Sequence, residues 1–145
     1  MKGKTNVGLV CNLGNDGVIK NLVIDESCSF TGESNVGAVA GSNIYANKRQ
    51  ILNVSSFATV KATVENAGGL IGKDEYDYFP TTTITNCIVG GIVEAPKGAG
   101  AIIGGENRNL NKKNIKITNS VSLAEVSGAN GENRFCRASG EFRNC

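Results

Sequence analysis

Acidic and aromatic side chains gather in one short stretch of this sequence, between residues 73 and 83. The stretch holds three carboxylates and three aromatic rings: Asp74, Glu75, Tyr76, Asp77, Tyr78 and Phe79. Paired carboxylates carry out glycoside hydrolysis, but only at defined separations and with shifted pKa values. Carboxylates also bind Ca²⁺, yet the sequence has neither an EF-hand loop nor the glycine-rich calcium repeat. We therefore expect a solvated loop without catalytic or metal-binding residues.

The residue types that are missing exclude several kinds of chemistry. The chain has no His, so it cannot form a Ser-His-Asp triad, a Cys-His pair or a Cys/His zinc site. It has no C-x-x-C pair and no phosphate-binding glycine loop leading into a helix. We expect a protein that is not an enzyme and needs no cofactor.

The charge and hydropathy of the chain exclude two classes of partner. The net charge is only +2, from 15 basic and 13 acidic residues, which does not favour nucleic acid. No apolar run approaches the length of about 18 residues that spans a membrane. We expect neither nucleic-acid binding nor direct membrane insertion.

The candidate residues must be positioned by a repeated element. A glycine-rich phrase begins at Asn6, Asn35, Asn66 and Gly98, at intervals of 29, 31 and 32 residues. Near-equal spacing of this size is typical of stacked repeat architectures. Gly makes up 19 of the 145 residues and Pro only 2, which favours strands joined by tight corners.

A second phrase, Ile-x-Asn, recurs in the same order. Its isoleucines lie 32, 33 and 33 residues apart, at Ile19, Ile51, Ile84 and Ile117. The positions two and seven residues beyond each Asn are mostly apolar and β-branched: Val23, Ser55, Ile88 and Val121, then Cys28, Val60, Val93 and Val126. This alternation predicts strands with one buried face. We expect an all-β fold, a short right-handed parallel β-helix (β-solenoid) of about four coils of about 30 residues.

The asparagines of the second phrase form a column of their own: Asn21, Asn53, Asn86 and Asn119. An inward amide at a corner can donate to the Asn of the next coil, forming a ladder. Asn also tolerates left-handed backbone conformations and is common in turns. We expect a structural Asn ladder, with turn formation as the alternative.

The two phrases together resemble the GLUG repeat of bacterial cell-surface and adhesin-like proteins. The resemblance covers residues 6 to about 128, with Val-Gly-x-Val-x-Gly followed by a loop and then Ile-x-Asn. The first copy departs by carrying Asn12 where the others have glycine, at Gly41, Gly72 and Gly104. The resemblance implies a repetitive, extracellular module and no catalytic residues.

Segments of varying length separate the two phrases, at 13–18, 42–50, 73–83 and 105–116. Insertions at one place in a repeat project from one face of a solenoid, often the binding face. The candidate binding residues are therefore Tyr45, Asp74, Tyr76, Asp77, Tyr78 and Phe79. Exposed aromatic side chains in these segments predict a host protein or a glycan as partner. Alternatively, the aromatic rings fold back and cover apolar surface on the flank of the solenoid.

These observations favour a non-enzymatic structural or adhesive module of a larger surface protein. The alternatives are a carbohydrate-binding or polysaccharide-processing β-helix domain, and a simple spacer. No apolar signal core follows the first five residues. We nevertheless expect an extracellular or cell-surface location, with flanking domains in a longer chain.

The cysteines and the tail complete the expected organisation. Cys11, Cys28 and Cys87 fall in apolar columns and are interpreted as buried hydrophobic residues. Residues 1–130 form the repeats, and 131–145 a non-repeat tail that caps the last coil or is disordered. Cys136 and Cys145 lie nine residues apart, which leaves a disulfide between them open.

Overall fold

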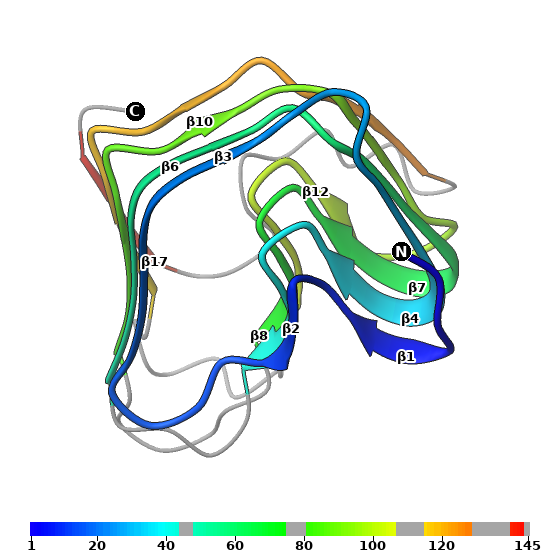
Figure 1. Cartoon of the computed structure of the whole chain (residues 1–145), viewed down its shortest axis with the longest axis horizontal. Helices are drawn as coiled ribbons and strands as arrows, with labels where there is room; N and C mark the ends of the chain where they lie inside the picture. The colour runs from blue at the N-terminus through cyan, green and yellow to red at the C-terminus, as the bar shows by residue number, and fades with distance from the viewer. Residues whose placement is uncertain (44–47, 75–80, 107–114, 129–139, 144–145) are drawn as a thin grey trace.

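The chain is an all-β solenoid. The computed structural model describes residues 1–43, 48–74, 81–106, 115–128 and 140–143, and these contain strands but no helix. Viewed down its axis, the chain runs clockwise as it recedes, and successive coils stack in parallel (Figure 1). The predicted right-handed parallel β-helix is confirmed. No helix among the described residues is long and apolar enough to cross a membrane.

Three parallel sheets line the solenoid (Figure 1). Sheet A contains β1 (Thr5–Val7), β4 (Ser29–Gly37), β7 (Thr59–Gly68), β11 (Ile92–Glu94) and β16 (Glu125–Ser127), with β12 (Ala99–Gly100) also beside β7. Sheet B contains β2 (Val10–Asn12), β5 (Ala40–Asn43), β8 (Ile71–Asp74) and β13 (Ile103–Glu106). Sheet C contains β3 (Gly17–Ile24), β6 (Lys48–Ser56), β9 (Thr81–Thr85), β10 (Ile88–Val89), β14 (Ile115–Thr118), β15 (Val121–Ser122) and β17 (Gly140–Arg143).

The glycine phrase forms the sharp corner between sheet A and sheet B. A Cβ added to Gly68 would lie 1.9 Å from the Ile71 carbonyl oxygen and 2.6 Å from the Gly104 nitrogen, so the corner admits no side chain. In the second to fourth copies of the phrase, the residues two and three positions after Gly37, Gly68 and Gly100 are completely buried. They are Val39, Leu70 and Ile102, then Ala40, Ile71 and Ile103. Both faces of this segment are therefore covered.

The isoleucine column of sheet C is confirmed. Ile19 pairs with Ile51, Ile51 with Ile84, and Ile84 with Ile117. The last three are completely buried. Because the same branched side chain repeats at one level of every coil, the isoleucines stack into a continuous core that no single coil could form.

The next predicted column faces solvent instead of the core. Val23, Ser55, Ile88 and Val121 are in register as expected, but Val23 is 71% exposed. The inward position is the residue directly after each Asn, as in Val54 and Cys87. The Asn backbone has a positive φ, which turns the chain and breaks the period-2 alternation of an extended strand.

The alignment of Cys28 with the core valines is wrong. Phe30, not Cys28, pairs with Val60, and Val60 pairs in turn with Val93. The first coil holds two additional residues here, in a turn where the Asp25 carboxylate accepts a 2.9 Å hydrogen bond from the Ser27 amide. Hydrogen bonding to Ser27 lowers the pKa of Asp25. Cys28 is half-buried at the edge of the core.

Cys11 is also misplaced by the sequence alignment. Val10 pairs with Ala40, since the glycine phrase of the first coil is one residue shorter than the others. Cys11 is consequently exposed. Cys87, by contrast, is buried as predicted.

The tail returns to the solenoid. Strand β17 pairs in parallel with β14, with Phe142 opposite Ile117. Residues 140–143 therefore continue sheet C beyond the last Ile-x-Asn phrase. The remainder of the predicted tail, including Cys136 and Cys145, lies outside the described residues.

Candidate functional site

The corner where sheet B passes into sheet C carries the segments predicted to bind. Asn43, at the end of β5, is in register with Asp74 at the end of β8. Across the corner, Arg49 is in register with Thr82. The described residues on either side of segments 44–47 and 75–80 therefore lie in register at one corner.

A buried polar cluster lies beneath this corner. Arg49 Nη1 lies 3.2 Å from Asp74 Oδ1. Thr82 Oγ1 donates a 3.0 Å hydrogen bond to Asp74 Oδ2, and Asn43 Nδ2 donates a 3.4 Å hydrogen bond to Thr82 Oγ1. Asp74 is 7% exposed and the other three side chains are fully buried. Asp74 is thus the partner of a buried cation and does not lie in a solvated loop.

Apolar residues flank Asn43 and Thr82 along the axis, while Glu106 is in register with Asp74. On the amino-terminal side, Leu13 is buried and its amide donates to the Ser42 carbonyl, which places it beside Asn43. On the other side, buried Ile115 pairs with Thr82. Because the ion pair is buried, each of its members depends on the other.

The predicted binding residues divide into two groups. Asp74 belongs to the buried cluster, while Tyr45, Tyr76, Asp77, Tyr78 and Phe79 lie outside the described residues. Asn43, Arg49 and Thr82 were not predicted. Arg49 and Thr82 each stand two residues before an isoleucine of the core column, and this period-2 spacing was a usable signal that they face inward.

The predicted Asn column forms a ladder and also makes turns. Asn53 Nδ2 donates to Asn21 Oδ1 and Asn86 Nδ2 donates to Asn53 Oδ1, each over 3.1 Å. These residues and Asn119 all have φ between 49° and 56°. The ladder lies on the exposed outer side of the corner, not inside it as predicted.

A second ladder, which the sequence comparison missed, begins the glycine phrase. Asn66 Nδ2 donates to Asn35 Oδ1 and Asn35 Nδ2 donates to Asn6 Oδ1, each over 2.9 Å. Asn6 Nδ2 then donates to Asn12 Oδ1 over 3.3 Å within its own coil. Asn12 thus gives the end of this ladder an acceptor. The predicted alignment of Asn12 with the repeat glycines is wrong, because the shorter first phrase puts Asn12 in register with Ser42.

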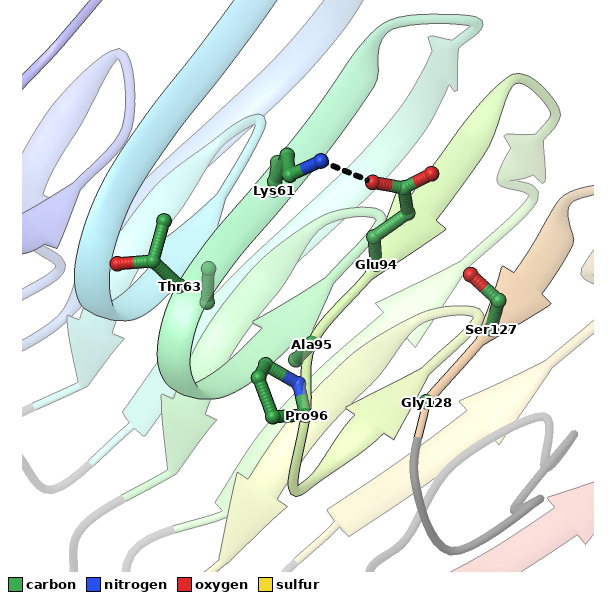
Figure 2. A pocket seen from close by; sticks show the side chains of 8 residues that line it. Lys61, Thr63, Glu94, Ala95, Pro96, Ser127 and Gly128 are labelled. Carbon is green, nitrogen blue, oxygen red and sulfur yellow. Dashed lines mark ion pairs between the residues drawn. The ribbon is translucent and has the colours of Figure 1, made fainter.

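A shallow groove of about 470 Å³ lies away from the corner, on the outer face of sheet A (Figure 2). Its lining comes from β7, β11 and β16 and the residues after them: Lys61, Ala62, Thr63, Glu94, Ala95, Pro96, Ser127 and Gly128. Lys61 Nζ and Glu94 Oε2 form a 2.8 Å ion pair between adjacent coils. The groove is the second place where polar groups converge.

Two further observations concern metal-ligating and nucleophilic side chains. Within the described ranges, no group of three or more His, Cys, Asp or Glu residues is placed to hold a metal ion. Burial raises the pKa of the Cys87 thiol, which disfavours the reactive thiolate.

Comparison with known proteins gives one partial likeness. A stretch of 70 residues, 48% of this chain, is 37% identical to Halomucin of Haloquadratum walsbyi (strain DSM 16790 / HBSQ001). The match spans only 1% of the length of Halomucin. No protein-family model matches the chain, and no solved structure matches it.

Proposed function

We propose that this chain is a non-enzymatic adhesive or structural module of GLUG type within a larger extracellular or surface protein. It displays the segments between sheets B and C to a host protein or a glycan. The observation that carries the proposal is the buried cluster of Arg49, Asp74 and Thr82, which anchors the strands on both sides of that corner. A rigid base positions variable segments, as binding loops require.

The surface location is supported by the partial likeness to Halomucin. The name of that protein marks it as mucin-like. Solenoids also suit this role, because stacking identical coils gives an extended surface from a short repeated sequence. The share of Halomucin that is matched is small, so its likeness supports the location and not a particular ligand.

A carbohydrate-binding β-helix domain is the second candidate. Its support is the groove on sheet A, where an ion pair and a hydroxyl group stand beside an apolar wall. Polysaccharide cleavage is less well supported, since Asp74 at the corner is paired with Arg49.

The proposal is tested by replacing Tyr76, Tyr78 and Phe79 together with Ala in the full chain. Wild-type and variant proteins are screened against immobilised glycans and extracellular-matrix proteins. Loss of a ligand in the variant, with an unchanged circular dichroism spectrum, supports display at the corner. A ligand that the variant binds as well as the wild type does would overturn it, and so would the absence of any ligand for the wild type.

A further inference from the structure

The groove on sheet A has a polar side and an apolar side. The polar side consists of the Lys61 ammonium group, the Glu94 carboxylate and the Ser127 hydroxyl (Figure 2). The Lys61 and Glu94 side chains are 52% and 38% exposed. Their ion pair is therefore accessible, and an exposed pair of this kind contributes little to stability. A ligand can share these charges at small cost to the fold.

The opposite side of the groove is apolar. Ala62 and Ala95 are buried in the floor, and the Pro96 ring is exposed beside them. Thr63 Oγ1 donates a 3.4 Å hydrogen bond to the Gly32 carbonyl, and Figure 2 shows this hydroxyl directed away from Pro96 and Ser127. Thr63 thus contributes little polarity to the groove. Hydrogen-bonding groups on one side and a small apolar wall on the other make the groove amphipathic.

We propose that this groove binds a neutral saccharide ring. A pyranose has the same two-sided character, with hydroxyl groups around its rim and an apolar face of C–H groups. Neighbouring hydroxyls can donate to Glu94 and accept from Lys61, while the C–H face packs on Pro96. The charges of Lys61 and Glu94 cancel, which favours a neutral sugar over a uronic or sialic acid.

The size and composition of the groove set the expected strength of binding. A volume of about 470 Å³ lies within the range of small-molecule sites, about 300 to 1,000 Å³. No aromatic ring is among the described residues that line the groove, so no contribution from ring stacking is counted. We expect a dissociation constant on the order of 1 mM. The inference rests on the proposed extracellular role but places the sugar at a site separate from the corner segments.

The test is a titration of the ¹⁵N-labelled full chain with maltohexaose and xylohexaose, followed by amide NMR shifts. Shifts should centre on residues 61–63, 94–96 and 127–128. Glu94→Gln and Lys61→Met should each weaken binding at least about tenfold, the effect of one charge-assisted hydrogen bond. Glu65→Gln and Lys97→Met are matched controls, because Lys97 Nζ and Glu65 Oε2 form a 3.1 Å ion pair outside the groove. They should leave binding unchanged.

Four results would overturn the groove proposal. The first is no shift at about 50 mM saccharide, well above the expected dissociation constant. The second is equal binding by the wild type and Glu94→Gln, and the third is tighter binding of oligogalacturonate than of the neutral sugars. Shifts confined to the corner, around Asn43 and Asp74, would also reject the groove but would support the proposed function. The two proposals can therefore fail separately.

Discussion

Arg49 Nη1 lies 3.2 Å from Asp74 Oδ1, although the two residues belong to adjacent coils and to different sheets. Arg49 starts the strand of sheet C in one coil, and Asp74 ends the strand of sheet B in the next. Burying both charges costs hydration energy, which their attraction and the hydrogen bond from Thr82 must offset. The pair therefore links coils and sheets at the point from which the proposed binding segments emerge.

The two members of this pair should not contribute independently to stability. Asp74→Asn or Arg49→Met removes the opposite charge from a buried ion pair and should lower the free energy of unfolding by about 3 to 5 kcal/mol. The double variant Arg49→Met/Asp74→Leu should be less destabilised than the sum of the single changes. Urea unfolding followed by circular dichroism measures all three.

Lys61 provides the matched control, since its ion pair with Glu94 is exposed. Lys61→Met should change stability by no more than about 1 kcal/mol. Equal losses for Lys61→Met and Arg49→Met would contradict the role assigned to the buried pair.

The outer Asn ladder allows its two contributions to be separated at Asn53, which has a neighbour on both sides and φ of 54°. Asn53→Gly removes the ladder hydrogen bonds but permits the positive φ, and should cost about 1 kcal/mol. Asn53→Ala also introduces left-handed strain, and should cost about 1 to 2 kcal/mol more. Thermal or urea unfolding gives both values. If the glycine variant is as stable as the wild type, the ladder hydrogen bonds contribute nothing to stability and Asn53 acts only through its turn conformation.

Sequence periodicity predicted the stacking because one coil repeats one set of contacts. The intervals between Ile19, Ile51, Ile84 and Ile117 are nearly constant, so the register of sheet C followed directly. It could not predict which way a side chain points after an Asn, since one residue in the left-handed conformation shifts the inward positions. Val23 and Val54 show the consequence, exposed and buried respectively.

The candidate site was harder to predict than the core. Asp74 was assigned to an acidic loop from its sequence neighbours, but its partner Arg49 is 25 residues away in a different coil. Only the stacking register brings them together. The insertion that puts Phe30 opposite Val60 was likewise hidden, because a short turn absorbs extra residues without changing the repeat around it.

The glycines of the repeated phrase should differ sharply from those of the connecting segments. Gly68→Ala places a Cβ 1.9 Å from the Ile71 carbonyl oxygen, so the corner must open and stability should fall by at least about 3 kcal/mol. At Gly14 no atom lies within 4 Å of the added Cβ. Gly14→Ala should therefore be neutral or slightly stabilising. Similar unfolding midpoints for the two variants would contradict this account of the corner.

The buried thiol of Cys87 should make stability depend on alkaline pH. Burial raises the pKa of this thiol above its ordinary value of 9.0. The folded state therefore holds the proton more tightly, and its advantage is complete below pH 9.0 and is lost as the pH rises toward the folded-state pKa. Unfolding measured from pH 8 to 10.5 should show a decline that Cys87→Ala lacks. Identical pH profiles would exclude a contribution from Cys87.

Two adjacent residues of β11 test which face of sheet A packs on the core. Val93 is completely buried between Val60 and Val126, whereas neighbouring Ile92 is 39% exposed. Val93→Asp places an unpaired carboxylate in the core column, and its cost of several kcal/mol should abolish folding. Ile92→Asp exchanges one solvent-facing side chain for another and should retain the β-sheet circular dichroism spectrum. If Val93→Asp folds as well as Ile92→Asp does, sheet A is not packed on this core. The two substitutions introduce the same residue at adjacent positions, so the difference in stability between the two variants reports which face of β11 points into the core.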